Sequence, residues 1–272
     1  MPATLDQIVA AARNRVSDTR KQADLRDLER RASQHHVRGF RAGLEKRAAA
    51  GTAIIAELKK ASPSRGVIRS DFDVAKLAVE LEGAGAAALS VLTDEAFFQG
   101  SLENLSRASA ATKLPCLRKD FIVDEFQLLE ARASGADAVL LIVAALSSHE
   151  FGKLWRKSRE FELDILCEVH DREELQRALE SGCDIIGVNS RDLRTFRVDL
   201  ETPQKLGQLI PPKFFRVAES GINCGEDVRR LRAVGYQAFL VGESLMRAAS
   251  PGAALRELLA ASGERSVSRA IH

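Results

Sequence analysis

The chain has 272 residues, of which 45% are hydrophobic and 5% aromatic, and its 40 Lys and Arg nearly balance its 38 Asp and Glu. A hydrophobic fraction of this size excludes a largely disordered chain, and a net charge of +2 is too small to indicate a nucleic-acid or membrane partner. No apolar run approaches the ~18 residues that a transmembrane helix needs, and the N-terminus does not resemble a signal peptide, so we expect a cytoplasmic protein.

The first fifty residues contain apolar side chains at helical spacing. Leu5, Ile8, Val9, Ala12 and Val16 fall on one face of a helix, and shorter stretches with the same period follow. We therefore predict a helical extension over residues 1–50, packed on a main domain over residues 51–262. Residues 263–272, in which Ser and Arg alternate, are expected to form a flexible tail.

Eight short runs rich in Val, Ile, Leu and Ala follow the extension. They are Ala53–Leu58, Ala87–Leu92, Cys116–Phe121, Ala138–Val143, Asp164–Val169, Ile185–Asn189, Arg216–Ser220 and Ala238–Gly242. Because they are almost continuously apolar rather than alternating, they are typical of parallel strands covered on both faces. Amphipathic stretches between them predict helices at Val74–Glu82, Leu102–Ala111, Glu125–Ala133, Arg172–Ser181 and Val228–Ala233.

A glycine precedes every second predicted strand. Gly85, Gly135, Gly182 and Gly235 stand where a left-handed cap would end a helix and turn the chain back toward the sheet. The residues around Gly85 match a dinucleotide-binding pattern by letters, but they follow a helix and enter a strand, which is the wrong context. Eight strand–helix units arranged as four double units favour a (β/α)8 TIM barrel over an open sheet.

The cysteines and histidines give no metal-binding pattern. The chain has four Cys and five His without a Cys-x-x-Cys pair or a recognisable ligand spacing, so no metal site is expected. Cys116 and Cys167 lie in apolar runs, and we expect both to be packed thiols.

Charged residues interrupt the first, third, fifth and seventh predicted strands. They are Glu57, Lys59, Arg118, Lys119, Asp120, Glu168 and Glu219. Alternate strands of a barrel supply each interior layer, so these side chains are expected to form one polar layer near the carboxyl ends, where barrel active sites lie. Carboxylates and ammonium groups held close together favour general acid–base catalysis. A buried ion-pair network without chemistry is the alternative.

Three loops that follow strands are suited to a phosphate group. Residues 62–66 follow the first strand and begin with Ser62, Ser220 and Gly221 follow the seventh, and Gly242 with Glu243 turns the eighth strand into a short helix. The loops after strands seven and eight form the common phosphate site of this fold.

Three further residues stand near strand ends. Arg191, two residues after Asn189, offers a bidentate phosphate contact or a surface salt bridge. Phe98 and Phe121 either line a pocket for an aromatic substrate or cap the core.

Six segments, in chain order, resemble the signature segments of the indole-3-glycerol phosphate synthases of tryptophan biosynthesis. They are residues 55–64 (IAELKKASPS), 97–101 (FFQGS), 117–122 (LRKDFI), 187–193 (GVNSRDL), 217–222 (VAESGI) and 241–246 (VGESLM). The likeness extends from about Leu5 to Leu258, and the ordered set is much more specific than any single segment.

The resemblance implies a carbon–carbon lyase without metal or organic cofactor. Its substrate is 1-(2-carboxyphenylamino)-1-deoxyribulose 5-phosphate, and ring closure to indole-3-glycerol phosphate releases carbon dioxide and water. By position in the segments, Lys119 is the general acid that protonates the ribulose carbonyl, and Glu168 acts in the dehydration. Lys59 holds the substrate carboxylate or serves as a second acid, while Glu57 and Asn189 position these groups and the substrate hydroxyls.

The resemblance also implies a set of substrate- and phosphate-binding residues. They are Ser62, Arg191, Glu219, Ser220, Gly221, Gly242 and the backbone amide of Glu243. Some family members carry a basic residue in place of Ala61 and serine in place of Glu243. A carboxylate beside a phosphate repels it unless the side chain points away, so only the amide of Glu243 is assigned.

Two other classes of function remain open from the sequence. The first is a different phosphosugar barrel enzyme, for instance a Schiff-base lyase with Lys119 or Lys59 as nucleophile. The second is a barrel that binds its ligand without catalysis. The near-zero net charge and the absence of an aromatic–basic patch disfavour a nucleic-acid binder. We expect a monomer or weak homodimer whose partner is a small phosphorylated molecule.

Overall fold

The computed structural model describes residues 4–192, 198–199 and 201–263. Leu193, the last residue of the fourth signature segment, and residues 264–272 of the predicted tail lie outside the described residues. No helix in the described ranges is long and apolar enough to span a membrane.

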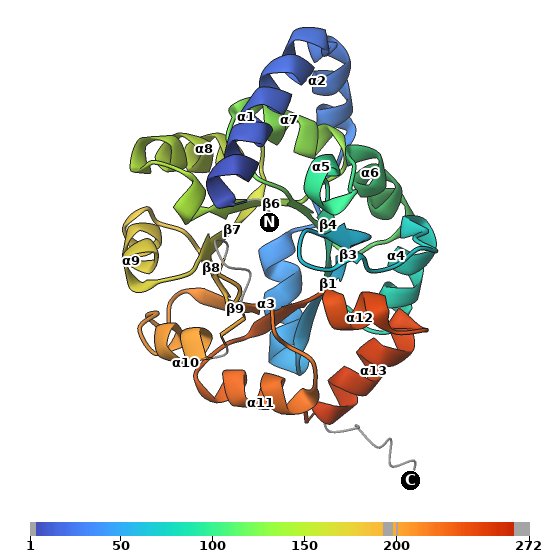
Figure 1. The fold of residues 1–272 in the computed structure, drawn as a ribbon, viewed down its shortest axis with the longest axis vertical. Coiled ribbons are helices and arrows are strands. Elements are labelled where there is room, and N and C mark those ends of the chain that lie inside the picture. The colour runs from blue at the N-terminus through green and yellow to red at the C-terminus, as the bar shows by residue number, and fades with distance from the viewer. Residues whose placement is uncertain (1–3, 193–197, 200, 264–272) are drawn as a thin grey trace.

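Eight parallel strands in the described part of the chain close into a barrel, each paired with its neighbours in chain order (Figure 1). They are β1 (Ala53–Leu58), β4 (Ala88–Leu92), β5 (Cys116–Lys119), β6 (Ala138–Ile142), β7 (Asp164–Val169), β8 (Ile185–Asn189), β9 (Phe215–Glu219) and β10 (Ala238–Val241). The predicted (β/α)8 barrel is therefore confirmed, and the predicted strands differ from these bounds by at most two residues at an end.

Helices surround the barrel and separate its strands (Figure 1). They are α4 (Val74–Gly83), α6 (Leu102–Ala111), α7 (Glu125–Ala133), α8 (Ser148–Glu160), α9 (Arg172–Glu180), α10 (Glu201–Gly207), α11 (Gly225–Ala233), α12 (Glu243–Arg247) and α13 (Pro251–Ala261). Short elements lie in the connections: β2 (Ala61–Ser62), β3 (Gly66–Val67), α5 (Glu95–Phe98) and the 3-10 turn η1 (Val143–Ala145).

The glycine caps are confirmed by the backbone. The φ angles of Gly85, Gly135, Gly182 and Gly235 are 99°, 84°, 77° and 96°, a region that side-chain-bearing residues rarely adopt. The reading of Gly85 as a cap rather than as part of a dinucleotide site follows from this conformation.

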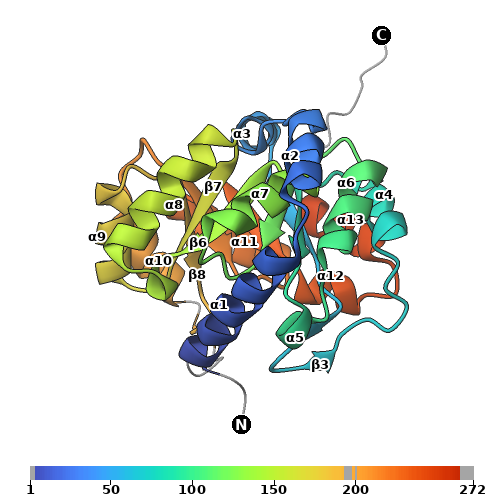
Figure 2. The same ribbon diagram turned by 90° about the horizontal axis from the view of Figure 1, so that it is seen from above.

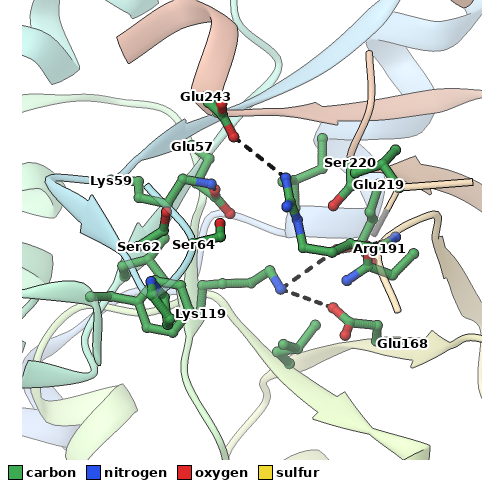
Figure 3. Close-up of a pocket in the computed structure, with 18 of the residues that line it drawn as sticks. Glu57, Lys59, Ser62, Ser64, Lys119, Glu168, Arg191, Glu219, Ser220 and Glu243 are labelled. Carbon is green, nitrogen blue, oxygen red and sulfur yellow. Dashed lines mark hydrogen bonds and ion pairs between the residues drawn. The ribbon is translucent and has the colours of Figure 1, made fainter. Parts of the chain in front are cut away.

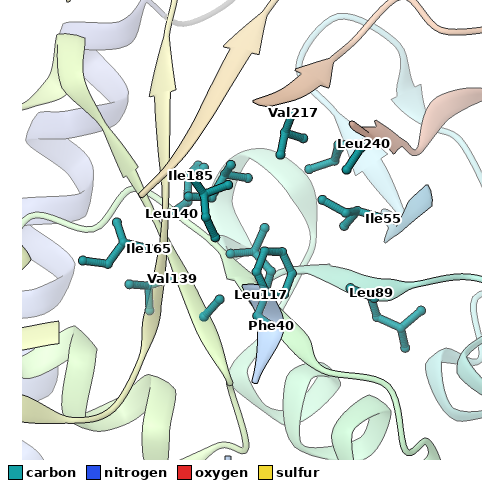
Figure 4. Packing of buried hydrophobic residues seen from close by; sticks show 14 of the residues in the cluster. Phe40, Ile55, Leu89, Leu117, Val139, Leu140, Ile165, Ile185, Val217 and Leu240 are labelled. Atoms are coloured by element: carbon teal, nitrogen blue, oxygen red, sulfur yellow. The ribbon is translucent and has the colours of Figure 1, made fainter. Parts of the chain in front are cut away.

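The core consists of strand side chains from all round the barrel and of the inner faces of the helices. Strand residues such as Ile55, Leu117 and Leu140 are at most 1% exposed (Figure 4). Burial on both faces is what the nearly continuous apolar runs predict for parallel strands.

Three helices precede the barrel: α1 (Leu5–Gln22), α2 (Leu25–Gln34) and α3 (Phe40–Ala50). The backbone amide of Arg41 donates to the carboxylate of Asp164, the first residue of β7 (2.9 Å), so α3 lies at the amino-terminal end of the strands. Figure 2 shows α3 at one end of the molecule and α5 and β3 at the other. The loops that follow the strands thus remain open to form a site.

The cysteine prediction is half wrong. Cys116 is a buried free thiol, and burial raises its pKa to about 12. Cys167, expected to be a packed thiol as well, forms a disulfide with Cys183, with their Cα atoms 6.5 Å apart. The pairing follows from the fold, because β7 and β8 are neighbours and Cys183 stands just before β8.

Candidate active site

A pocket of about 390 Å³ opens at the carboxyl ends of the strands, a volume suited to a small ligand. All the predicted site residues line it: Glu57, Lys59, Ser62, Phe98, Lys119, Phe121, Glu168, Asn189, Arg191, Glu219, Ser220, Gly221, Gly242 and Glu243. The structure therefore brings together residues that are spread over nearly 190 positions, from 57 to 243. Their chemical roles depend on the geometry described next.

An ion pair between two strands lies at the centre of the pocket (Figure 3). The Nζ atom of Lys119, at the end of β5, is 2.9 Å from Oε2 of Glu168 on β7 and 3.6 Å from Oε2 of Glu219 on β9. The Lys119 side chain is 14% exposed, and each carboxylate is 1% exposed. One cation is thus held between two carboxylates in a largely water-free site.

The electrostatics of this group separate the two carboxylates. Burial alone would lower the pKa of Lys119, but attraction to Glu168, Glu219 and Glu57 outweighs it and raises that pKa. For Glu168, the neighbouring Lys119 overcomes burial and lowers the pKa. Burial, together with the charge of Glu168, raises the pKa of Glu219 to about 8. Of the two carboxylates, Glu168 is therefore the one that stays ionised beside the ammonium group, and Glu219 is the one that retains a proton more readily.

A second ion pair stands beside the first. The Nζ atom of Lys59 is 2.6 Å from Oε1 of Glu57, as expected for residues spaced i, i+2 along one strand face. Two glycines make room for the inward carboxylates. A Cβ at Gly242 would collide with Glu57, and one at Gly187 would overlap Glu219.

Arg118 does not belong to the polar layer, contrary to the sequence prediction. Its guanidinium is 3% exposed and pairs with Asp120 (2.9 Å) and with Glu130 of α7 (3.2 Å), between the barrel wall and the helix. Strand side chains alternate between the two faces of a barrel, so Lys119 points inward and Arg118 outward.

Helix α1 contributes a wall that the sequence analysis did not assign to the site. Leu5 and Ile8 line the pocket. Arg15 fixes the helix there, since its guanidinium nitrogens lie 2.6 Å from Asp94 and 3.0 Å from Asp120, both 1% exposed. The helical spacing of Leu5 and Ile8 was visible in the sequence, but nothing there indicated which surface they cover.

On the side of the pocket predicted for phosphate, the carboxylate of Glu243 faces Arg191 (Figure 3) and also pairs with Arg65. Glu243 lies 3.1 Å from Nε of Arg65 and 3.4 Å from Nη2 of Arg191. The buried hydroxyl of Ser62 has no hydrogen-bond partner among the described residues. Ser220 is a non-glycine residue with a left-handed φ of 65°, a conformation typical of functional turns.

Two phenylalanines also line the pocket. The rings of Phe98 on α5 and Phe121 after β5 lie 6.4 Å apart between centroids and are tilted by 36°. An aromatic pair of this kind suits an aryl group in the ligand.

His170 lies beside Glu168, although its place in the sequence pattern did not mark it as a site residue. Its Nε2 is 3.3 Å from Oε1 of Glu168, and its Nδ1 is 3.0 Å from Glu174 on α9. The i, i+2 spacing that pairs Glu57 with Lys59 also relates Glu168 to His170, so the signal was present. Among the residues that the structure describes, no group of three or more His, Cys, Asp and Glu is arranged to hold a metal ion.

Fold and site together define a (β/α)8-barrel enzyme with a buried acid–base group, an aromatic wall and a basic rim. A family model described as indole-3-glycerol phosphate synthase matches residues 5–258. An indole-3-glycerol phosphate synthase of Koribacter versatilis is 57% identical over 95% of this chain and 100% of its own length. Another, of Leptothrix cholodnii, is 48% identical over 94% of this chain and 98% of its own.

The chain belongs to the indole-3-glycerol phosphate synthase family. It is therefore an enzyme, a decarboxylating lyase of tryptophan biosynthesis. Solved structures agree on the fold alone. A thiamine phosphate pyrophosphorylase from Pyrococcus furiosus is 21% identical with a TM-score of 0.57 over 78% of this chain and 95% of its own, and a mandelate oxidase variant is 18% identical with a TM-score of 0.58 over 78% and 72%.

Proposed function

We propose that this pocket closes the indole ring of 1-(2-carboxyphenylamino)-1-deoxyribulose 5-phosphate by general acid–base catalysis, with Lys119 as the acid. The observation that carries the proposal is the buried ion pair of Lys119 and Glu168, 2.9 Å apart, between a basic rim and an aromatic wall. A substrate that carries a phosphate and an aryl carboxylate can use both the arginines and the phenylalanines of this lining.

The first chemical step joins the ring carbon that bears the carboxylate to the ribulose carbonyl carbon. Lys119 donates its proton to the carbonyl oxygen as the new bond forms. Loss of carbon dioxide returns the electron pair of the broken bond to the ring. The raised pKa of Lys119 keeps the amine protonated, so it carries the proton that the carbonyl oxygen takes up and is poorly suited to act as a Schiff-base nucleophile. The carboxylates that raise this pKa also oppose release of the proton, so the negative charge that develops on the carbonyl oxygen must draw the proton away.

Dehydration completes the indole. An acid, which we take to be Lys59 or the reprotonated Lys119, protonates the hydroxyl formed in the first step, and the C–O bond breaks to release water. A base removes a proton from the neighbouring ribulose-derived carbon, whose C–H electrons form the carbon–carbon double bond of the indole. Glu168 is ionised and buried beside Lys119, so we assign it to this step. Lys59, paired with Glu57, holds the substrate carboxylate or acts as a second acid, and Asn189 contacts the substrate hydroxyls.

The phosphate end of the substrate is assigned to the basic rim. The phosphate is surrounded by Ser62, Arg191, Ser220, Gly221, Gly242 and the backbone amide of Glu243, with Glu219 nearby. Phe98 and Phe121 accept the aryl ring.

We also propose that the protein is cytoplasmic and is a monomer or weak homodimer. It requires no nucleic acid, membrane or cofactor. Residues 1–50 form an extension of a barrel domain over residues 51–262.

A fluorescence assay for indole formation from this substrate, with no added metal, tests the proposal. Lys119→Met is expected to fold and to lose turnover by ~10²-fold or more, as removal of a general acid typically does. Lys76→Met on α4, where the lysine side chain is 85% exposed, is the matched control and is expected to keep full turnover. Turnover of Lys119→Met within a few-fold of the parent, or a borohydride-trapped adduct on Lys119, would rule out the acid role.

A further inference from the structure

The two oxygens of the Glu168 carboxylate face different side chains. Its Oε2 atom lies 2.9 Å from Nζ of Lys119, and its Oε1 atom lies 3.3 Å from Nε2 of His170. The second distance is that of an ion pair, since the buried Nε2 has no hydrogen-bond partner in the described part of the chain. The mechanism proposed above uses Lys119 and Glu168 but leaves His170 without a role. The side chain of His170 is only 13% exposed, so this contact is made in a nearly dry environment.

Glu174, on α9, determines how the ring of His170 is used. One of its oxygens, Oε2, accepts from the backbone amide of His170 (2.8 Å) and lies 3.0 Å from the ring Nδ1. A carboxylate only accepts, so Nδ1 must carry a hydrogen. Nε2 can then offer a hydrogen to Glu168 only when the ring is protonated, because a neutral ring with hydrogen on Nδ1 has a lone pair at Nε2.

We propose that His170 is a positioning residue which, as an imidazolium held by Glu174, fixes the orientation and the ionised state of Glu168 for the dehydration step. This inference rests on the role assigned to Glu168 in the proposed function. Glu174 on α9 would thus hold His170, and His170 would hold the base, Glu168.

The charges around His170 are consistent with a protonated ring. Burial alone would lower its pKa, but Glu168 and Glu174 outweigh burial and raise the pKa to about 10. Strands β6 and β8, which flank β7, carry no ionisable side chain, and η1, packed on α9, is Val-Ala-Ala. Lys119 approaches Glu168 from its other oxygen.

Two amide substitutions separate the two nitrogens of the ring. His170→Gln places an amide donor near the position of Nε2, whereas His170→Asn places one near Nδ1 and loses the contact with Glu168. We expect kcat to fall by about 10- to 100-fold in His170→Asn, as for loss of a charge-assisted contact, with KM within about threefold. His170→Gln is expected to recover a large part of that loss. A purely structural histidine predicts equal losses in both variants, and that result would overturn the inference.

Glu174→Gln tests whether Glu174 keeps His170 protonated, and it leaves the imidazole ring in place. With one carboxylate gone, the imidazolium loses its proton at lower pH, so kcat is expected to decline between about pH 7 and pH 10, where the parent enzyme keeps a protonated ring. Glu173→Gln, an exposed neighbour on the same helix, is the matched control. A profile of Glu174→Gln that superimposes on those of the parent and of Glu173→Gln would contradict the proposal.

Glu168→Gln separates failure of this inference from failure of the proposed function. It is expected to lower kcat by at least ~10²-fold. If Glu168→Gln retains turnover, the assigned base is wrong and the role of His170 is overturned with it. If Glu168→Gln is inactive while both His170 variants match the parent, the mechanism stands and only the inference about His170 is overturned.

Discussion

Glu243 places a carboxylate on the rim where the substrate phosphate is expected to bind. The sequence leaves the direction of its side chain open, and in the structure the Glu243 carboxylate lies within 3.4 Å of both Arg65 and Arg191. Two cations suited to a phosphate are thus already paired with an internal anion. The phosphate must either displace Glu243 from these arginines or bind to them alongside it. The negative charge of the Glu243 carboxylate opposes binding of the phosphate.

Replacing Glu243 by Gln is expected to lower KM by about three- to tenfold at low salt, because the repulsion of the phosphate is removed and the arginines are released. We expect kcat to stay within about twofold, since the reacting groups lie on β5 and β7. Steady-state kinetics at several salt concentrations measure both. Glu226→Gln, on the exposed side of α11, is the control. A rise of KM in Glu243→Gln would show instead that Glu243 is needed to orient the arginines.

At the scale of elements, α1 precedes the barrel in the sequence, whereas the other residues of the site lie on the strands of the barrel and the loops that follow them. Arg15 reaches Asp94, 79 residues away, and Asp120, 105 residues away. Asp94 caps the start of α5, which carries Phe98, and Asp120 directly follows Lys119. One side chain therefore ties the helix that lines the pocket to both the aromatic wall and the acid.

Arg15→Met is expected to loosen α1 and to raise KM by about tenfold, because Leu5 and Ile8 no longer close the pocket and two buried carboxylates lose a partner. Hydrogen exchange should become faster in α1 but not in α13. Arg13→Met, also on α1, removes an exposed pair with Glu150 of α8; it is the matched control and should cost at most about 1 kcal/mol of stability. Equal KM values in the two variants would show that the ion pairs of Arg15 with Asp94 and Asp120 do not affect substrate binding.

The whole molecule shows which features the sequence could predict. The barrel was predictable because strand periodicity and glycine caps are local signals. That the predicted residues would line one pocket was predictable because strand ends converge in a parallel barrel. Arg118 was misplaced because the inward face of a strand depends on its register with its neighbours. The Cys167–Cys183 bond depends on which strands lie side by side, and the contacts of Arg15 depend on how a helix docks across 100 residues of chain.

The buried charge layer also makes the stability of the whole barrel depend on pH. The pKa of Glu219 is raised from 4.5 to about 8 in the folded protein, so between these values the unfolded chain has released a proton that the folded chain retains. The free energy of unfolding must therefore fall as pH rises through this window, by at most about 1.4 kcal/mol per pH unit for this group. His170 adds to the fall above pH 6.5, because its folded pKa is also raised, to about 10.

Glu219→Gln removes the proton retained by Glu219 and leaves the contribution of His170. Relative to the parent, the variant is expected to gain stability steadily from pH 5 to pH 8, although we expect it to be a poorer enzyme because Glu219 lies 3.6 Å from Lys119. Urea unfolding at intervals across this range measures the difference. Glu226→Gln is expected to follow the parent at every pH, because its carboxylate is exposed and the substitution leaves the barrel interior unchanged. A constant difference between Glu219→Gln and the parent would mean that Glu219 is already ionised in the folded protein at pH 5, and that Lys119 faces two carboxylates rather than a carboxylate and an acid.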